Sequence, residues 1–310
     1  MFSLKKNNVS FVLLLICMTL PTVISAETNR QHYTKDTFIH WLNAAYIAQA
    51  AYQTTEKMTA VLKTQGYEVE KSRQIEGFSV GYILATNHQS RQHILAVRGT
   101  ANVENIMVDA AFVLVPDKLT SIKIHQGFLL SARDIYHSVK DEITPGYTIN
   151  TIGHSLGGAA AVILAMMFDS QGFPIGEVIT FGQPKVTNIS GSRNFEHLNI
   201  TRLVTPKDIV PLIPPLDPMD MMNLSIFWHQ GIEVVLYQNN QYAVLTGISS
   251  MLRAADFLTD VPSKQHINNH FMSTYIDYLK PKLESPVEIK YESDFKFSDW
   301  FGSSTTENKK

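Results

Sequence analysis

The sequence predicts an α/β protein in which a mostly parallel central sheet carries helices on both faces. The main observation is that β-rich runs alternate with helix-forming runs along the chain, which is typical of parallel strands joined by helices. The 310 residues are 45% hydrophobic and 17% charged, a composition that suits a globular protein with a sizeable core. No internal repeat or low-complexity block interrupts the pattern, so we expect a single domain.

The first half of the domain begins with a helix and two strands. An Ala-rich apolar run at 38–53 predicts a helix against the core. Two β-rich runs, 78–86 and 92–100, flank the polar turn 87–90 and predict a pair of strands. Apolar residues recur at helical spacing after Gln126, which predicts a helix over 126–143.

The second half continues the alternation. Further strands are predicted at 147–153, 177–184 and 200–208 and as a pair within 231–246, and further helices at 154–168 and 268–280. His266 and His270 are expected in the last loop before the C-terminal helix. The Pro- and Met-rich stretch 211–228 predicts a packed loop. The sequence leaves the role of the 246–265 insertion open; the alternatives are a helix, a second flap and a packing element.

Residues 1–26 have the pattern of an export signal peptide. Lys5 and Lys6 precede a short apolar run, and small residues lead to a predicted cleavage after Ala26. The run is shorter than the roughly 20 apolar residues of a membrane span, although an uncleaved anchor is the alternative. We expect a secreted or periplasmic protein whose mature chain has no transmembrane span. Cleavage would remove Cys17, the single cysteine, so no disulfide is expected.

The mature chain is expected to comprise a domain at 27–283 and a loosely ordered C-terminal extension at 284–310, which is rich in acidic, Ser and Thr residues. Loss of two lysines and no acids changes the formal net charge from −2 to −4. No basic stripe is visible, so we expect no nucleic-acid partner.

Residues Gly153 to Gly157 form a G-x-S-x-G motif between a predicted strand and a predicted helix. In this context the motif is typical of the nucleophile elbow of α/β-hydrolases. Glycines two residues before and after the serine leave room for the neighbouring strand and helix. The N-terminus of the helix adds positive potential where an oxyanion develops. We therefore predict that Ser155 is a nucleophile rather than part of a plain glycine bend.

A serine nucleophile needs a base and an acid, which follow it in the order acid, then histidine, in this fold. Asp208 follows the β-rich run 201–206, which would place its carboxylate at the active-site edge of a parallel sheet. Among the histidines after Ser155, His266 and His270 lie where the base should arrive, and spacing alone does not choose between them.

The oxyanion that forms during ester attack needs two donors. The backbone N–H of Leu156, the residue after the nucleophile, supplies one. The second donor should come from the loop after an early strand. Thr100 is the last residue of the run LAVRGT (95–100), and it can offer both a backbone N–H and a hydroxyl. His154, inside the motif, is expected to be a packing residue.

These segments together resemble the class 3 lipase family, the fungal-lipase-like branch of the α/β-hydrolases. The matching segments are AVRGT (96–100), IHQGFL (124–129), TIGHSLGGAAA (151–161), TFGQPKVTN (180–188), RLVTPKDIVPLIPP (202–215), WHQGIEVVLY (228–237) and HFMSTY (270–275). The resemblance implies Ser155 as nucleophile, Asp208 as acid and His270 as base, with Thr100 and Leu156 as oxyanion donors. It favours His270 over His266 through the offsets of Met272 and Tyr275, and it makes His229 structural.

The resemblance implies a secreted serine esterase that hydrolyses lipid esters, similar to triacylglycerol lipases, at a lipid–water interface. It implies no metal and no organic cofactor. A phospholipase A or lysophospholipase, an acyltransferase of the same fold, and a catalytically silent lipid-binding protein are the alternatives. A lid is expected at 101–107, but the Trp that often follows the family's lid is absent, which leaves interfacial activation open. The oligomeric state is also left open.

Overall fold

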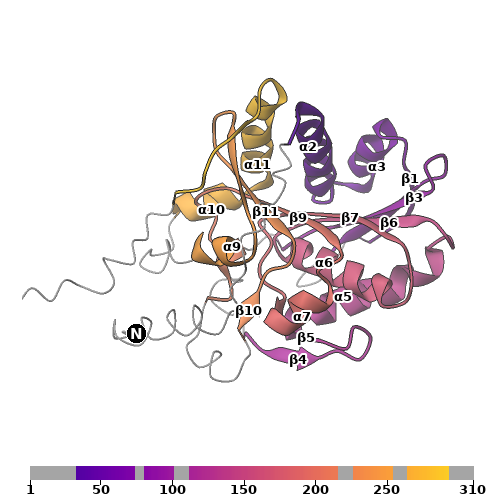
Figure 1. The fold of residues 1–310 in the computed structure, drawn as a ribbon. Helices are drawn as coiled ribbons and strands as arrows, with labels where there is room; N and C mark the ends of the chain where they lie inside the picture. Colours follow the sequence, from indigo (N-terminus) through magenta and orange to yellow (C-terminus); the bar gives the residue numbers. More distant parts are fainter. Residues whose placement is uncertain (1–32, 74–79, 101–111, 216–225, 254–263, 293–310) are drawn as a thin grey trace, which may run out of the picture.

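The computed structural model describes residues 33–73, 80–100, 112–215, 226–253 and 264–292 (Figure 1). A nine-stranded sheet forms the centre of this part of the chain. Its strands, in spatial order, are β1 (Glu68–Arg73), β2 (Tyr82–Asn87), β3 (Gln92–Val97), β6 (Thr148–His154), β7 (Ile175–Phe181), β9 (Asn199–Val204), β11 (Ile232–Leu236), β12 (Gln241–Leu245) and β13 (Val287–Glu288). The five strands from β3 to β11 pair in parallel, whereas β1, β2 and β12 pair antiparallel with their inner neighbours. The predicted mostly parallel sheet is confirmed.

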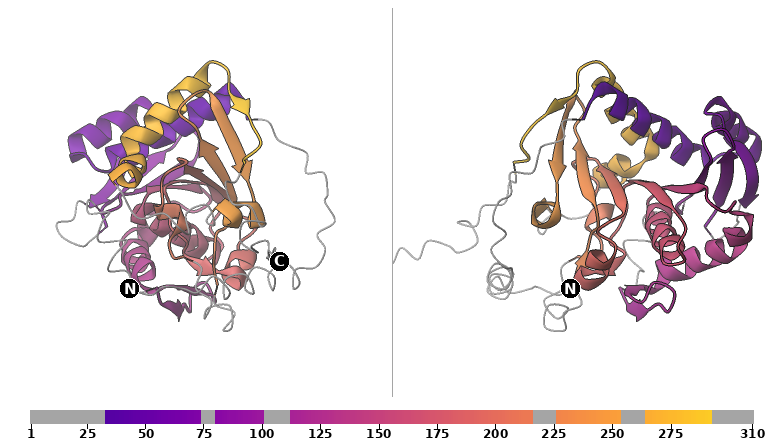
Figure 2. Two further views of the ribbon diagram at one scale, coloured as in Figure 1. Left: turned by 90° about the vertical axis from the view of Figure 1, so that its left-hand side faces the viewer. Right: turned by 45° about the vertical axis from the view of Figure 1, so that its right-hand side comes forward.

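Helices cover both faces of this sheet (Figure 2). One face carries α5 (Gln126–Val139) and α6 (Leu156–Asp169), and the other carries α2 (Lys35–Ala50), α3 (Thr55–Thr64) and α11 (Met272–Leu279). The pleat of β2 separates the two cores: Leu84 packs with α5 and α6, whereas its neighbours Ile83 and Ala85 pack with α2. Strand β2 is therefore apolar on both sides, as expected for a sheet covered by helices on both faces.

Helix α6 is the most deeply buried helix of this layer. Every side of it is apolar, and every residue from Gly157 to Phe168 is buried. A helix that is hydrophobic all round can be stable only inside a protein. Its position between α5 and the sheet makes it a rigid support for the turn at Ser155, which directly precedes it in the chain.

A second, four-stranded antiparallel sheet lies beside the main one and was not predicted. Its spatial order is β10 (Phe227–Trp228), β8 (Thr187–Asn188), β5 (Lys123–His125) and β4 (Leu114–Pro116). Short helix α7 (Ile189–Asn194) begins where β8 ends, with the Asn188 side chain accepting from the N–H of Gly191. Strands of two or three residues carry too little periodicity to be recognised in a sequence.

The C-terminal part corrects two expectations. His266 and His270 lie on helix α10 (Lys264–His270), not in a loop, and α10 is followed directly by α11. The predicted loose extension is wrong at its start, because Val287–Glu288 pairs with β12 as strand β13. Residues 293–310, like the predicted signal peptide, lie outside the described residues.

Part of the 246–265 insertion forms helix α9 (Gly247–Arg253), which packs through buried charges. Glu233 on β11 accepts from Arg202 Nη1 at 2.7 Å and also pairs with Arg253, and all three side chains are almost completely buried. Ser250 donates a further hydrogen bond to Glu233. Removing one partner of such a buried group is strongly destabilising, so this half of the insertion acts as a packing element.

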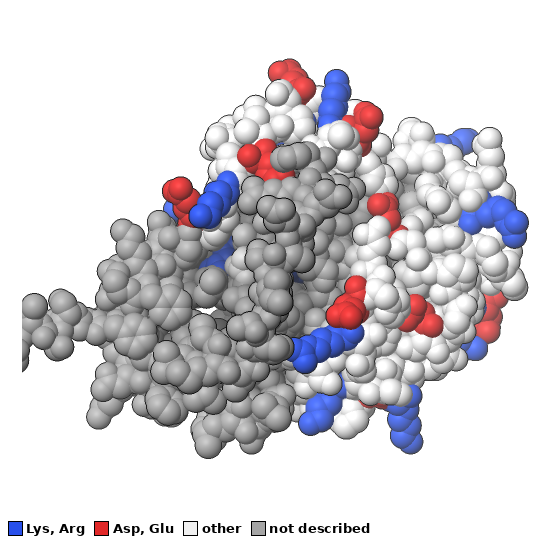
Figure 3. Space-filling view, in the orientation of Figure 1, with Lys and Arg blue, Asp and Glu red and all other residues white. Residues whose placement is uncertain are grey.

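None of the described helices is long and apolar enough to cross a bilayer. Within the described ranges, no cluster of His, Cys, Asp and Glu has the arrangement of a metal site. On the face in Figure 3, the basic and acidic side chains of the described residues are interspersed, without a large patch of one sign.

Candidate active site

Ser155 lies at the sharp turn between β6 and α6. Its backbone has φ 59° and ψ −131°, an unusual conformation for a residue other than glycine. The flanking glycines make this turn possible: a Cβ at Gly153 would lie 2.2 Å from the carbonyl oxygen of Gly157. A Cβ at Gly157 would lie 2.3 Å from the carbonyl oxygen of Val97 on β3. The strand, turn and helix expected for a nucleophile elbow are all present, and such strained serines are typical of functional sites.

Asp208 and His270 meet at the same edge of the sheet. His270 Nδ1 donates to Asp208 Oδ2 at 2.8 Å, and both side chains are completely buried. Tyr275 also donates its hydroxyl to Asp208 Oδ2, and the N–H of Val210 donates to Oδ1 at 2.9 Å. Burial alone would raise the pKa of the Asp208 carboxyl, but His270 and the other donors outweigh it, so the pKa is lowered. Asp208 therefore stays ionised and fixes the His270 ring with Nε2 turned away from it.

Gly182 permits this close approach. The residue follows β7 with φ +58°, and a Cβ there would lie 2.8 Å from both Asp208 Oδ2 and His270 Nδ1. The sequence analysis gave this glycine no role, although it lies in the matching segment 180–188. It was missed because its role depends on a contact with residues that are distant in sequence.

Ser155 Oγ and His270 Nε2 are the two reactive atoms that would have to meet. Each is buried without a hydrogen-bond partner among the described residues. Unpaired buried polar atoms are uncommon and call for a functional reason. Catalytic hydrogen bonds are often long before substrate binds, so an unpaired nucleophile and base fit a resting site.

Leu156 follows the serine directly, and the segment that leads to Thr100 lies against it. Leu156 is the first residue of α6, so its N–H has no partner within the helix. Thr100 follows β3 in the segment that contacts the elbow: a Cβ on the preceding Gly99 would lie 2.9 Å from Ser155 Cβ. The structure therefore brings the Thr100 segment to Ser155. The predicted lid at 101–107 lies outside the described residues.

His154 does more than pack. Its Nε2 lies 2.7 Å from the backbone oxygen of His270, and its Nδ1 lies 2.8 Å from the hydroxyl of Tyr52. The ring of His154 also packs beside the ring of His270, with centroids 4.6 Å apart. Tyr52 follows α2 in a plain Ala-rich stretch, and no spacing in the sequence connects it to the motif.

The remaining candidates lie elsewhere. His229 bonds the carbonyl oxygen of Pro211 at 2.6 Å and is buried, in line with the structural role implied by the resemblance. His197 pairs with Asp169 at 3.0 Å on the surface. His266 is buried on α10, one turn before His270, and His270 is the histidine that hydrogen-bonds Asp208.

Acidification is expected to destabilise the protein through His154 before the carboxylates titrate. Burial and the neighbouring His270 lower the pKa of His154 to about 3 from its ordinary 6.5. Between these values only the unfolded chain binds the proton, so the unfolding free energy falls as pH falls, by up to about 1.4 kcal/mol per pH unit. Denaturant unfolding at pH values between about 6.5 and 4.5 measures this slope.

A variant that cannot titrate at this position provides the control. His154→Gln is expected to have a shallower pH slope than the natural protein, although His125 and His229, whose pKa values burial also lowers, contribute with the same sign. Identical slopes for the two proteins would contradict this assignment.

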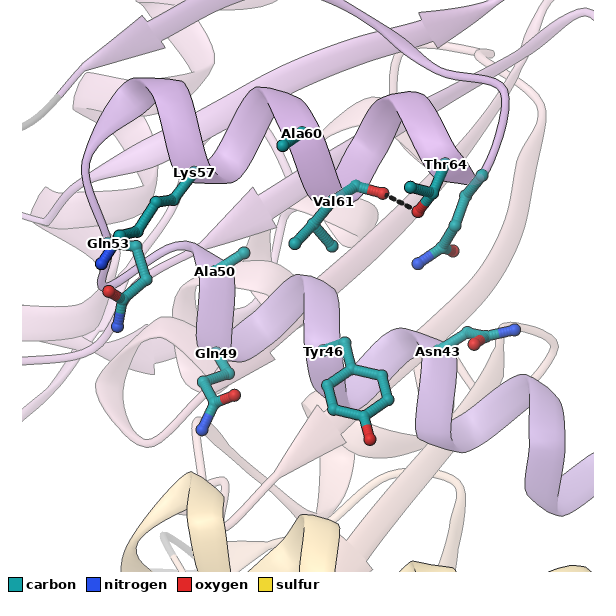
Figure 4. A pocket seen from close by; sticks show the side chains of 10 residues that line it. Asn43, Tyr46, Gln49, Ala50, Gln53, Lys57, Ala60, Val61 and Thr64 are labelled. Atoms are coloured by element: carbon teal, nitrogen blue, oxygen red, sulfur yellow. Dashed lines mark hydrogen bonds between the residues drawn. The ribbon is translucent and has the colours of Figure 1, made fainter.

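A separate groove of about 610 Å³ lies between α2 and α3 (Figure 4). Asn43, Tyr46 and Gln49 line it from α2, and Lys57, Val61 and Thr64 line it from α3. None of the residues of the candidate active site contributes to this groove, so it is distinct from the Ser155 site.

A family model matches the part of the chain around Ser155. Residues 94–217 match the family model described as Lipase (class 3). This segment, which contains Ser155 and Asp208, is similar to the class 3 lipase family. The match includes the elbow, the oxyanion segment and the acid, and it ends before His270.

Several fungal proteins are similar to the chain. The "Secreted mono- and diacylglycerol lipase A" of Penicillium cyclopium is 30% identical over 146 residues, which cover 44% of this chain and 48% of that protein. The "Lipase" of Rhizopus niveus is 31% identical over 166 residues, covering 49% of this chain and 40% of that protein. The aligned part is thus less than half the length of these curated relatives.

Solved lipase structures share the fold. A mutant form of the Penicillium cyclopium protein MDLA superposes with a TM-score of 0.60 at 23% identity, over 78% of this chain and 96% of that one. The Rhizomucor miehei lipase propeptide complex superposes with a TM-score of 0.55 at 23% identity, over 66% and 70% of the two chains. The fold is therefore the α/β-hydrolase fold.

Proposed function

We propose that this protein is a serine esterase that hydrolyses the carboxylic ester bonds of lipids. The observation that carries the proposal is the strained strand-to-helix turn at Ser155, whose preceding residue His154 hydrogen-bonds the backbone of His270, the histidine paired with buried Asp208. A hydroxyl becomes a nucleophile only when a neighbouring base accepts its proton, and an imidazole held by a carboxylate is such a base.

The proposed reaction has two steps. Ser155 Oγ attacks the ester carbonyl while His270 Nε2 accepts the hydroxyl proton, and the same proton then passes to the leaving alcohol. An acyl-enzyme remains, and His270 next deprotonates a water molecule that releases the acid and restores Ser155. The backbone N–H groups of Leu156 and Thr100, together with the Thr100 hydroxyl, would hold the oxyanion in both steps.

Asp208 would act through His270. Its three hydrogen bonds and lowered pKa keep it a carboxylate that accepts from His270 Nδ1. This contact leaves Nε2 free to accept the proton and stabilises the imidazolium that forms.

Two observations favour a lipid substrate. The relatives named above include secreted lipases of mono- and diacylglycerols and other lipases. Large apolar side chains are also exposed: Phe271 directly follows His270, and Phe112 and Val113 contact the start of α5, which carries exposed Leu130. Exposed apolar groups of this kind suit contact with a lipid surface.

A substrate can reach Ser155 only after covering residues move. Ser155 and His270 have no exposed surface in this structure. The lid expected at 101–107 lies outside the described residues, and we propose that the protein acts at a lipid–water interface. We also propose export through a signal peptide at 1–26, which the secreted relatives support.

Reaction with a fluorophosphonate probe and hydrolysis of an ester panel test the proposal. We expect the probe to label the protein at Ser155, located by mass spectrometry of the peptides, and the protein to hydrolyse acylglycerols or p-nitrophenyl acyl esters. Absence of both labelling and hydrolysis would refute the proposal and favour a silent lipid-binding protein. Phospholipids, lysophospholipids and added alcohols in the same panel distinguish phospholipase and acyltransferase activity from acylglycerol hydrolysis.

A further inference from the structure

Tyr52 and His154 form a hydrogen-bonded bridge that connects three segments of the site. The Tyr52 hydroxyl lies 2.8 Å from His154 Nδ1 and 3.0 Å from the backbone nitrogen of Gly99. His154 Nε2 lies 2.7 Å from the backbone oxygen of His270. The bridge thus reaches the residue before Thr100, the residue before Ser155, and the proposed base itself.

The direction of each hydrogen bond follows from its partners. The carbonyl oxygen of His270 can only accept, so His154 Nε2 carries the proton and donates. His154 Nδ1 then has a free lone pair and accepts from the Tyr52 hydroxyl. The Tyr52 oxygen in turn accepts from the N–H of Gly99, so every donor in the bridge meets an acceptor.

Burial preserves this pattern. His154 is buried and Tyr52 is half-buried, and this burial lowers the pKa of His154 to about 3 and raises the pKa of Tyr52 above its usual range. At neutral pH both groups are therefore uncharged. The Arg98 guanidinium, 5.7 Å from the centre of the Tyr52 ring, provides a further contact to this side chain.

The bridge also caps the helix that carries the base. His270 is the last residue of α10, where backbone carbonyl groups have no partner within the helix. His154 Nε2 donates to the carbonyl of His270, and the Thr205 hydroxyl donates to that of Asn269 at 2.8 Å. The backbone that supports the His270 ring is thus held from the elbow side by His154.

The space around the bridge is tight. A Cβ at Gly99 would lie 2.6 Å from the backbone oxygen of His154, 2.7 Å from the Tyr52 hydroxyl and 2.9 Å from Ser155 Cβ. The oxyanion segment therefore has little freedom to move while the Gly99 N–H stays bound to Tyr52.

We propose that Tyr52 and His154 are positioning residues for the ester hydrolysis proposed above, on which this inference rests. They set the spacing between the nucleophile, the base and the oxyanion segment without contacting the substrate. A displacement of about 1 Å at a reacting group can cost about 100-fold in rate. Loss of the bridge should consequently lower kcat while leaving substrate binding largely unchanged.

The experiment compares Tyr52→Phe with Tyr242→Phe. Tyr52→Phe removes one hydroxyl and leaves the ring, so the Gly99 N–H and His154 Nδ1 lose their partner. Tyr242 is a matched control, because it lies in the same core cluster, is almost completely buried, and its hydroxyl accepts from the N–H of Tyr33 at 3.1 Å. We expect Tyr52→Phe to lower kcat on a soluble p-nitrophenyl ester about 10- to 100-fold with KM changed less than about 3-fold.

A second pair of variants tests His154. His154→Phe keeps an aromatic ring but loses both hydrogen bonds, whereas His154→Gln keeps a side-chain N–H that can donate to the His270 carbonyl. We expect His154→Gln to recover part of the kcat lost in His154→Phe, with thermal unfolding measured for all variants. Rates are compared per folded, active-site-titrated protein, so that lost folding does not imitate lost positioning.

The outcomes separate this inference from the proposed function. If Tyr52→Phe turns over as fast as Tyr242→Phe while the natural protein hydrolyses the ester, the bridge has no positioning role and the inference is overturned. The inference is also overturned if kcat per folded protein is normal in Tyr52→Phe and His154→Phe alike. If the natural protein neither hydrolyses esters nor reacts with the fluorophosphonate, the proposed function fails and the inference falls with it.

Discussion

Ser155→Ala is expected to lower kcat for ester hydrolysis about 10⁵- to 10⁶-fold, to a level set by the residual oxyanion contacts. The substitution removes the atom that attacks the carbonyl, and the neighbouring backbone offers no replacement. The measurement is the rate of p-nitrophenyl ester hydrolysis by the purified variant beside the natural protein, under identical conditions.

The unfolding midpoint of Ser155→Ala shows whether the variant is folded, independently of its activity. Ser155 Oγ is buried and has no hydrogen-bond partner among the described residues, so its removal leaves none of their polar groups unsatisfied. We therefore expect the unfolding midpoint to be unchanged or raised, and fluorophosphonate labelling to disappear. An active Ser155→Ala variant would refute the nucleophile assignment, and a large loss of stability would contradict the description of an unpaired hydroxyl.

Asp208→Asn is expected to lower kcat about 10⁴-fold with less effect on KM. Oδ2 of Asp208 accepts from both His270 Nδ1 and the Tyr275 hydroxyl, and Oδ1 accepts from the N–H of Val210. An asparagine that keeps the Val210 bond turns its NH₂ toward His270 and Tyr275, where donor meets donor. The His270 ring then loses the partner that fixes its protonation, and its Nε2 can no longer serve as the base.

Asp169→Asn is the matched control for this substitution. Asp169 also pairs with a histidine, His197, at 3.0 Å, but this pair lies on the protein surface and away from Ser155. Surface pairs of this kind contribute about 0 to 1 kcal/mol to the free energy of unfolding, so we expect nearly normal stability. We expect normal kcat because the pair lies away from Ser155. Equal activity of Asp208→Asn and Asp169→Asn would remove Asp208 from the mechanism.

Much of the fold could be read from local patterns. The long helices α2, α5 and α6 and the strands β3, β6 and β7 carry strong periodicity or β-rich composition over at least six residues, and all were predicted close to their observed positions. By contrast, β4, β8 and β10 have two or three residues each, and they exist only because distant segments pair with them. Strand β13 was missed for the same reason.

The site residues that stand next to local patterns could likewise be predicted, whereas those that depend on distant contacts could not. Ser155 and Asp208 stand next to recognisable strands, so their positions at one edge of the sheet follow from the order of elements. For the base, spacing left His266 and His270 open, and only the family resemblance favoured His270. The hydrogen bond between His270 and Asp208 shows which of the two histidines the fold brings to the acid.

The sequence by itself determined the class of fold, the elbow around Ser155 and the order in which acid and histidine follow it, because periodicity, glycine spacing and chain order are local properties. Only the tertiary structure decided that Gly182 makes room for His270, that Tyr275 bonds Asp208, and that Tyr52 joins His154 to Gly99. These contacts connect residues that are tens to more than a hundred positions apart. Burial in a shared core sets their distances and protonation, and no local pattern encodes which residues will share that core.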